Sequence, residues 1–346
     1  MSPPAAPPAS ASKPLNSLDP ARVERFADDL RRLFAGAAGE DVSAGAAIAL
    51  AVSGGADSMA MLLLAAAAFP GQVVAATVDH GLRSDAAAEA ALVAEICARL
   101  GVPHATLAPS APIAGASIQR QAREARYEAL TAWAQATGAV ALLTAHHADD
   151  QAETLLMRLN RASGVAGLSG IRPWRFEQDT LLLRPLLSWR RDDLRAVTVA
   201  AGAPWVDDPS NDDPRHDRTR FRALLAGQPM LDAAALARSA ACLGEAEAAL
   251  DMFAETLRAE RWSPGKGLLR AAGLPREMQR RLVRGAVAAV RAAHGIAAPA
   301  FSDSANVEAL LDALAAGRAA TQAGVLVSPE RDGGWRLTPA PPRRSL

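Results

Sequence analysis

Short apolar runs alternate with helical patterns through the first part of the chain. Apolar runs of strand length lie at 46–52, 73–78 and 140–144, and residues 102–107 are a further candidate for a short strand. Around these runs the sequence predicts helices at 20–34, 59–68, 86–100, 117–137 and 146–161. Strands that alternate with helices of this length are typical of βαβ units and a parallel sheet. Their continuous apolar character fits a sheet that is covered on both faces.

The pattern changes after about residue 222, where alanine-rich helical stretches replace the alternation. Residues 227–229 form a predicted linker. The expected elements beyond it are helices at 231–257, 275–294 and 306–314 and a hairpin of 325–327 with 335–337. We therefore expect a disordered tail at 1–19, an α/β domain at 20–225 and a smaller, mainly helical, substrate-binding domain at 230–340.

Composition narrows the class of protein. Acidic and basic residues are matched at 37 each, so the net charge does not indicate a polyanionic partner. No uncharged apolar run reaches the length of about eighteen residues that would predict a membrane span, and the Pro-, Ala- and Ser-rich start lacks the apolar block of a signal peptide. Cys97 and Cys242 are too few for a disulfide framework or a thiolate metal site. We expect both to be small core residues in a reducing, cytoplasmic compartment.

A glycine-containing loop follows the first predicted strand and precedes a buried helix. It consists of Ser53, Gly54, Gly55, Ala56, Asp57 and Ser58. The two glycines let the backbone approach a phosphate, and the helix N-terminus adds free N–H groups at the positive end of its dipole. The serine hydroxyls are further donors, and Asp57 is suited to orienting the loop or holding Mg²⁺. A strand–helix turn that merely uses glycine is the alternative, and the full hexapeptide in this context favours a phosphate site.

Two further polar segments follow. Val78 and His80 end the second predicted strand, and the carboxyl end of a parallel strand faces the nucleotide crevice of such folds. A capped turn explains these residues equally well. On the helix at 117–137, Gln119, Arg123 and Arg126 fall near one face. Such cations are suited to phosphates, although a charged face turned to solvent is just as common.

The segment from Thr144 to Thr154 carries the densest group of ionisable residues. Asp150 and Glu153 share a face of the expected helix with His146, and Asp149 also meets Glu153. Carboxylates gathered beside a helix N-terminus at a sheet edge are unfavourable unless they bind cations. A Mg²⁺ ion or an incoming ammonium group meets that need. A His-x-x-Asp metal site and an ordinary acidic first turn are the alternatives.

The loop at 53–58 resembles the Ser-Gly-Gly-x-Asp-Ser loop of the PP-loop ATP pyrophosphatases and lacks the Gly-Lys-Thr ending of a P-loop NTPase. Further segments, in order, resemble the tRNA(Ile)-lysidine synthetases within that class. They are His80-Gly81-Leu82, Ala125-Arg126-Tyr127, 146–154, 158–164, 167–170, 183–186, 205–212 and 218–222. One departure is Ala162, where the family usually has glycine; if this position needs positive φ, the local turn must differ here. The resemblance implies a parallel-sheet PP-loop (adenine nucleotide alpha hydrolase-like) domain followed by a smaller, mainly helical domain.

The resemblance also implies an activity. The expected reaction is ATP-dependent ligation of free L-lysine to C2 of the wobble cytidine of an isoleucine tRNA with a CAU anticodon. It passes through an adenylated tRNA, forms lysidine and changes the codon read from AUG to AUA. ATP and Mg²⁺ are the implied cofactors, no membrane partner is expected, and a homodimer is one expected assembly.

The resemblance and the residue patterns together give the expected site. The loop 53–58 with Val78 and His80 would bind ATP, and Asp57 would hold the metal. The catalytic candidates are Arg126, His147, Asp150 and Glu153, and the lysine-binding candidates are Asp149, Asp150 and Glu153. The tRNA-binding candidates are Arg123, Arg158, Arg161, Arg218, Arg220 and Arg222.

Other reactions share the loop. Base thiolation in tRNA usually needs reactive cysteines or an iron–sulfur cluster, and two isolated cysteines argue against it. Small-molecule amide ligases should lack the His-His-x-Asp-Asp segment. A non-enzymatic RNA-binding module gated by ATP is a further alternative, which pyrophosphate release in the presence of RNA would exclude.

Overall fold

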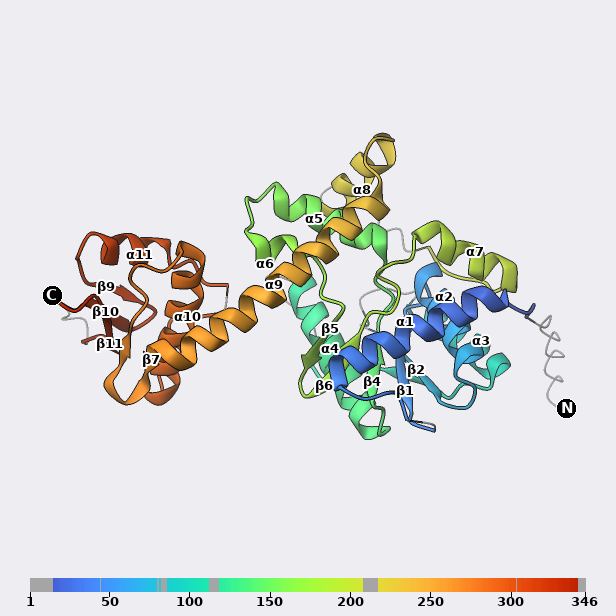
Figure 1. Cartoon of the computed structure of the whole chain (residues 1–346). Coiled ribbons are helices and arrows are strands. Elements are labelled where there is room, and N and C mark those ends of the chain that lie inside the picture. Colours follow the sequence, from blue (N-terminus) through green and yellow to red (C-terminus); the bar gives the residue numbers. More distant parts are fainter. Residues whose placement is uncertain are drawn as a thin grey trace, which may run out of the picture. The chain divides into compact units, whose positions relative to one another are not determined.

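The computed structural model describes residues 15–341 except 44, 80, 82–85, 112–117, 208–216 and 303. The chain divides into two compact units, Met1–Gly244 and Glu245–Leu346. The first unit is built on a six-stranded sheet with the order β3-β2-β1-β4-β6-β5 (Figure 1). Its strands are β1 (Ile48–Ala51), β2 (Val73–Val78), β3 (His104–Leu107), β4 (Ala141–Leu143), β5 (Trp174–Glu177) and β6 (Thr180–Leu183).

Five of these strands are parallel, which confirms the predicted sheet. The sixth strand, β5, runs antiparallel to β6, and the sequence did not predict this hairpin. Its turn has positive φ at Gln178 (46°) and Asp179 (61°). Positive φ at both central residues usually attracts Asn-Gly or Asp-Gly, so Gln-Asp gave no turn signal.

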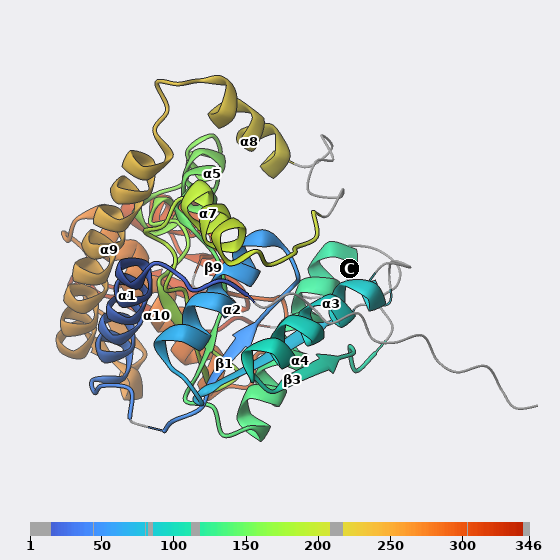
Figure 2. The ribbon, with the colours of Figure 1, turned by 90° about the vertical axis from the view of Figure 1, so that its right-hand side faces the viewer.

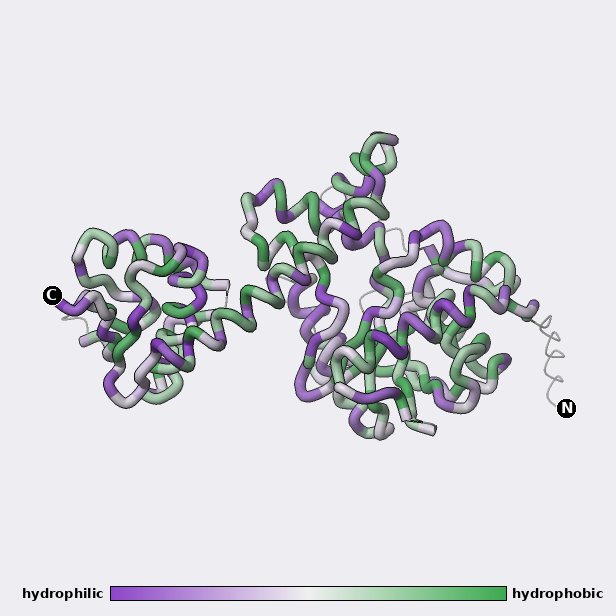
Figure 3. Tube along the Cα trace, viewed as in Figure 1, coloured by the Kyte–Doolittle hydropathy of each residue, from purple (hydrophilic) through white to green (hydrophobic). Residues whose placement is uncertain are grey.

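Helices cover both faces of the sheet of the first unit. They are α1 (Pro20–Ala38), α2 (Ala56–Ala68), α3 (Ala86–Leu100), α4 (Ile118–Ala136), α5 (Ala148–Leu159), α6 (Val165–Leu168), α7 (Arg191–Ala201) and α8 (Asp217–Gly227). Leu50 of β1 packs in one core with residues of α1, α2, α3 and α7. Its neighbour Ala49 packs in a second core with Tyr127 and Leu130 of α4. Successive strand residues therefore bury opposite sides. Figure 2 shows α2 and α4 on opposite sides of β1, and the interior of this unit is mainly hydrophobic in Figure 3.

The boundary between the units lies inside α9 (Ala233–Arg261), between Gly244 and Glu245. The sequence placed the break at the 226–229 segment. The difference arises because the first turns of α9 bury Ala233, Ala237 and Ala240. Close packing of Ala240 against Gly170 also keeps this part of the helix with the first unit.

The second unit combines helices with a small sheet. The second half of α9, α10 (Arg276–Ala293) and α11 (Glu308–Ala315) agree with the predicted helices. The predicted hairpin, β10 (Val325–Pro329) with β11 (Trp335–Pro339), is present and pairs Val327 with Leu337. It belongs to a five-stranded sheet completed by the short strands β7 (Trp262–Ser263), β8 (Leu268–Leu269) and β9 (Ala320–Gln322). Strands of two or three residues are too short to show a hydrophobic period.

Ala162 lies in the turn after α5 and has a φ of 52°. Its N–H donates to Leu159 O at 3.0 Å, and the next residue, Ser163, donates to Arg158 O at 3.1 Å. The expectation that the turn must differ where alanine replaces glycine is therefore wrong. The chain keeps a left-handed turn and places an alanine in it, against the steric preference of an L residue.

We expect Ala162→Gly to raise the free energy of unfolding by up to about 1 kcal/mol, because relief of the left-handed conformation outweighs the extra entropy of an unfolded glycine. Urea unfolding of the full chain measures the change. Ala132→Gly, in the exposed middle of α4, is the matched control, and it should lower the free energy of unfolding by about 1 kcal/mol. Equal losses at both positions would contradict this account.

Candidate active site

The candidate site lies at the carboxyl ends of β1 and β4, which are neighbours in the sheet. From β1 the strand order runs through β2 to β3 on one side, and from β4 it runs to β6 on the other. This reversal is the topological switch point, where open parallel sheets bind ligands. Both polar segments singled out by the sequence, 53–58 and 144–154, begin at this point.

The glycine loop is held by its own serines. The Ser58 hydroxyl donates to Gly55 O at 2.9 Å and accepts from the Ser53 N–H at 3.1 Å, and the two serine hydroxyls lie 3.2 Å apart. Gly54 has a φ of 89°, which explains the need for glycine there. Gly55 is the N-cap of α2 and gives that helix no side-chain cap. The N-terminus of α2 is thus offered to a ligand, with its partial positive charge.

A reciprocal cap fixes the start of α5. His147 is the N-cap residue, its N–H donates to Asp150 Oδ2 at 3.1 Å, and its Nδ1 accepts from the Asp150 N–H at 3.4 Å. Since Nδ1 acts as the acceptor, the proton of the neutral ring lies on Nε2. The sequence placed the start of this helix at His146, and the cap shows that helical geometry begins after His147.

His147 links the two segments. Its Nε2 lies 3.3 Å from Asp57 Oδ2, and the ring is 1% exposed. Burial lowers the pKa of His147, but the carboxylates of Asp150 and Asp57 outweigh burial and raise that pKa above its ordinary value. The other oxygen of Asp57, Oδ1, is buried without a hydrogen-bond partner among the described residues. The loop and the carboxylate segment therefore form one site.

The three carboxylates of α5 are paired with arginines of the same chain. Asp149 receives Arg190 Nη2 at 3.2 Å and the Arg191 N–H at 2.8 Å. Arg218 bridges the other two carboxylates, at 2.7 Å from Asp150 Oδ1 and 2.8 Å from Glu153 Oε2. The remaining partners of Glu153, which is 1% exposed, are Arg191 at 3.3 Å and Arg222 at 2.8 Å.

The pairs of Asp149 and Asp150 favour the charged form of these two carboxylates. Burial raises the pKa of Asp149, but the hydrogen bonds from Arg190 and from the backbone of Arg191 outweigh it, and the pKa is lowered overall. The pKa of Asp150 is also lowered, because His147 and Arg218 outweigh the effect of burial. The sequence predicted that the carboxylates need cations and proposed Mg²⁺ or ammonium. The structure supplies arginine side chains.

Helix α8 carries two of these arginines, Arg218 and Arg222, and has no buried residue. Its attachment to α5 is therefore mainly ionic. Arg220 of the same helix is exposed and lies 3.9 Å from Asp217, and Arg161 pairs with Asp217 at 2.6 Å. The remaining predicted tRNA contact on α5, Arg158, donates to the carbonyls of Gly167 and Gly170.

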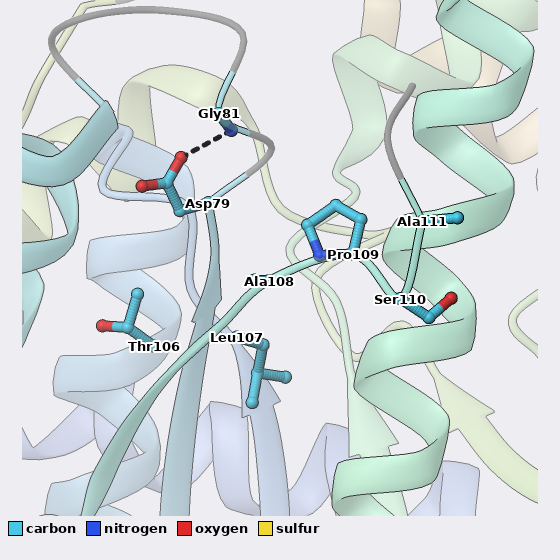
Figure 4. A pocket seen from close by; sticks show the side chains of 8 residues that line it. All are labelled: Asp79, Gly81, Thr106, Leu107, Ala108, Pro109, Ser110 and Ala111. Carbon is cyan, nitrogen blue, oxygen red and sulfur yellow. Dashed lines mark hydrogen bonds between the residues drawn. The ribbon is translucent and has the colours of Figure 1, made fainter. Parts of the chain in front are cut away.

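The ATP-site residues predicted on β2 are described only in part. Val78 is the last residue of β2, whereas His80 lies outside the described residues, as do residues 208–212 of the resembling stretch 205–212. Next to Val78, the Asp79 carboxylate accepts the Gly81 N–H at 2.8 Å. A hollow of about 410 Å³ opens here, and Figure 4 shows its lining by Asp79, Gly81 and residues 106–111. It lies at the carboxyl ends of β2 and β3.

Sequence reasoning missed several members of the site. Arg190 and Arg191 belong to a loop and helix start that the pattern did not predict, and no motif marks them. Arg126 and Arg123 lie on α4 as predicted, with their guanidinium carbons 5.2 and 5.0 Å from the ring centre of Tyr127. Tyr127 itself was noted only as part of Ala-Arg-Tyr.

Two other groups have restricted chemistry. Burial lowers the pKa of His146 to about 3, against the pull of Asp150, and Thr144 Oγ1 lies 3.0 Å from its Nδ1. His146 is therefore neutral near pH 7. Burial raises the pKa of the Cys97 thiol to about 12, so it is no thiolate nucleophile. Cys242 is exposed, and the expectation that both cysteines are core residues is wrong for Cys242.

Among the described residues no group of three His, Cys, Asp or Glu side chains is arranged to hold a metal ion, and no helix of this part of the chain is long and apolar enough to cross a membrane. A divalent ion shared between one carboxylate and substrate phosphates needs no such group. Asp57, with its unpartnered oxygen beside the loop, fits that kind of site.

A parallel sheet with a Ser-Gly-Gly-Ala-Asp-Ser loop at its switch point defines a nucleotide-binding protein of the PP-loop class, and the sequence matches the PP-loop domain family over residues 24–228. A "tRNA(Ile)-lysidine synthase" of Novosphingobium aromaticivorans is 42% identical over 86% of this chain and 90% of its own length. One of Methylobacterium nodulans is 42% identical over 93% of this chain and 97% of its own length. The chain belongs to the tRNA(Ile)-lysidine synthase family.

A solved structure supports the fold. The U34-tRNA thiolase NcsA from Methanococcus maripaludis, described with its [4Fe-4S] cluster, has a TM-score of 0.50 to this chain at 15% identity. The similarity covers 65% of this chain and 80% of the thiolase. At this identity the likeness establishes the PP-loop fold alone.

We expect Glu153→Gln to loosen α8, because three guanidinium groups lose their shared negative charge. Removal of a buried charged partner lowers the stability of the groups it held by about 1–3 kcal/mol. Hydrogen–deuterium exchange of the peptide 217–227 measures it and should become faster, while exchange in α2 stays unchanged. Asp217→Asn is the control, since its exposed pair with Arg161 contributes about 1 kcal/mol or less. Unchanged protection of α8 in Glu153→Gln would contradict an ionic attachment.

Proposed function

We propose that this protein ligates lysine to C2 of the wobble cytidine in a CAU-anticodon isoleucine tRNA, through an adenylated tRNA. The observation that carries the proposal is the contact between Asp57 of the phosphate loop and His147 at the start of the carboxylate helix. This contact supports the proposal because it joins the glycine loop at 53–58 to the carboxylate segment of α5. A ligase that activates a carbonyl with ATP and then adds an amine needs both.

In the first step the loop 53–58 binds the ATP phosphates through backbone N–H groups at the start of α2. The nucleoside extends along the sheet edge toward Val78 and the hollow beside Asp79. The C2 carbonyl oxygen of the cytidine attacks the α-phosphorus, and pyrophosphate leaves. Arg126 contacts the adenylate or the wobble nucleotide. Donors fixed before the reaction stabilise the charge that develops on the phosphates.

Asp57 would hold Mg²⁺ together with phosphate oxygens, because its Oδ1 is unpartnered and its Oδ2 is fixed by His147. When bound, the ion neutralises negative charge on the triphosphate. The role of His147 in this arrangement is to orient the Asp57 carboxylate. The cap with Asp150 in turn keeps the imidazole in place.

In the second step the lysine ammonium transfers a proton to Glu153, the resulting ε-amine forms a bond to C2, and the C2–O bond breaks to release AMP. Asp150 and Glu153, with Asp149 beside them, hold the ammonium before this step. Arg218 now bridges Asp150 and Glu153, and we propose that the lysine ammonium takes over this bridging position. The lowered pKa of Asp150 favours binding of the ammonium over proton acceptance.

The reacting base must leave the anticodon stack to reach a site at the switch point. Arg123, Arg158, Arg161, Arg220 and the arginines released from the carboxylates would neutralise RNA phosphates. A cytoplasmic location, where tRNA, ATP and free lysine occur together, and a homodimer remain parts of the proposal.

The substrate is tested by mixing the protein with ATP, Mg²⁺, radiolabelled lysine and unmodified transcripts. We expect label in the CAU isoleucine tRNA and none in a methionine tRNA with the same anticodon. Lysine-free reactions with the isoleucine transcript should still release pyrophosphate. Absence of label from both transcripts would refute the substrate, while pyrophosphate release separates that failure from loss of the ATP chemistry.

The two steps are separated by Asp150→Asn, which keeps an acceptor for the His147 N–H and removes the charge. We expect lysine transfer to fall at least about tenfold more than pyrophosphate release, since only the second step needs the ammonium site. Asp57→Asn is the matched comparison and should lower pyrophosphate release itself by about a hundredfold or more. Equal losses of both steps in Asp150→Asn would contradict its assigned role.

A further inference from the structure

Three guanidinium groups surround one aromatic ring beside the candidate site. The guanidinium carbons of Arg123, Arg126 and Arg175 lie 5.0, 5.2 and 5.1 Å from the ring centre of Tyr127. Two of them come from α4 and the third from β5. A single cation–π contact stabilises by about 0.5–2 kcal/mol, but three like charges around one ring repel each other.

A fourth arginine closes the group on its buried side. Arg184 follows β6, is 4% exposed, and donates to Arg172 O at 2.5 Å. Burial lowers the pKa of Arg184, the Tyr127 hydroxyl beside it acts in the opposite direction, and the charges of Arg175 and Arg123 lower the pKa further, so that it is lowered overall. We call Tyr127, Arg123, Arg126, Arg175 and Arg184 the Tyr127 cluster.

The Tyr127 cluster holds most of the unsatisfied polar atoms of the described chain. Among all described residues, five buried side-chain atoms lack a hydrogen-bond partner. Four of these five belong to the Tyr127 cluster: Tyr127 Oη and the Nε atoms of Arg126, Arg175 and Arg184. Tyr127 is itself only 4% exposed. Buried donors without partners are rare in native structures and indicate an absent ligand.

The charge of the cluster is also unbalanced. Among the described residues, the carboxylate that pairs with one of its four arginines is Glu177, on Arg175. The hairpin that carries Arg175 is fixed to α4, because Thr131 donates to Gln178 Oε1 at 2.7 Å and Gln135 to Gln178 O at 2.6 Å. The cations are therefore held together by the fold.

The ligand that these groups fit is a tetrahedral anion. Guanidinium forks supply donors alone and the phenol adds one more donor, whereas phosphate oxygens supply acceptors alone. The cluster packs over β4 and β6 through Leu142 and Leu182, whereas the phosphate loop follows β1. The positive charges of Arg184 and Arg126 contribute to the lowered pKa of His146, which lies next to the candidate site.

We propose that the Tyr127 cluster binds a backbone phosphate of the RNA substrate adjacent to the reacting nucleotide. The inference deepens the proposed function and rests on it. A phosphate held here would lie over β4 and β6, whereas the loop 53–58 follows β1. It would position the RNA strand without reading its sequence.

Binding of the isoleucine transcript to the full chain, without ATP or lysine, tests the proposal by fluorescence anisotropy at several salt concentrations. We expect Arg175→Gln to weaken binding about five- to tenfold and to reduce the slope of log K against log salt by about one. Tyr127→Phe should weaken binding about threefold with the slope unchanged, because it removes a neutral donor. Arg32→Gln, an exposed arginine of α1 paired with Asp29 at 2.6 Å, is the charge-matched control and should change neither.

Two parallel measurements identify other outcomes. ATP affinity, measured without RNA, should be the same in Arg175→Gln and the unaltered protein; a fall in ATP affinity with an unchanged RNA slope would assign the phosphate to the nucleotide and overturn the proposal. Thermal stability of Arg175→Gln should stay equal or rise, since repulsion is relieved. A loss of stability with unchanged RNA binding would make the cluster purely structural and overturn it too. RNA binding needs no lysine transfer, so these results remain interpretable if the ligase reaction fails.

Discussion

The contact between His147 and Asp57 is the interaction on which the rest of the site depends. It joins the start of α5 to the start of α2 across the switch point of the sheet, with Nε2 and Oδ2 3.3 Å apart. The reciprocal cap with Asp150 fixes the imidazole. One buried ring therefore sets the orientation of the Asp57 carboxylate in the glycine loop and of the Asp150 carboxylate at the start of α5. In the proposed function it would couple the geometry of the two steps.

Charge balance inside the first unit follows from the same arrangement. Buried carboxylates need cationic partners, and α7 and α8 supply them to Asp149, Asp150 and Glu153. The imbalance is reversed in the Tyr127 cluster, where among the described residues four arginines have one paired carboxylate. In the proposed function the carboxylates of α5 hold an ammonium group and the Tyr127 cluster holds a phosphate.

Much of the fold could be predicted from local signals. Apolar runs gave β1 to β4, and the glycine loop and the acidic segment located both halves of the site. The β5–β6 hairpin was missed because Gln178 and Asp179 replace the usual turn residues. The partners of the carboxylates were missed because Arg190, Arg191 and Arg218 are distant in sequence from Glu153 and belong to no periodic pattern. Ion pairs between residues that are far apart in the sequence produce no local pattern from which they could be predicted.

Helix α8 has no buried residue and meets α5 through guanidinium–carboxylate pairs. Detachment of such a helix exposes little apolar surface. The equilibrium between attached and detached α8 therefore has a small heat-capacity change and depends weakly on temperature. It responds instead to whichever cation competes for the two carboxylates. In the proposed function the ammonium group of lysine is such a competitor, and its arrival and the departure of a guanidinium would be a single ion-exchange event.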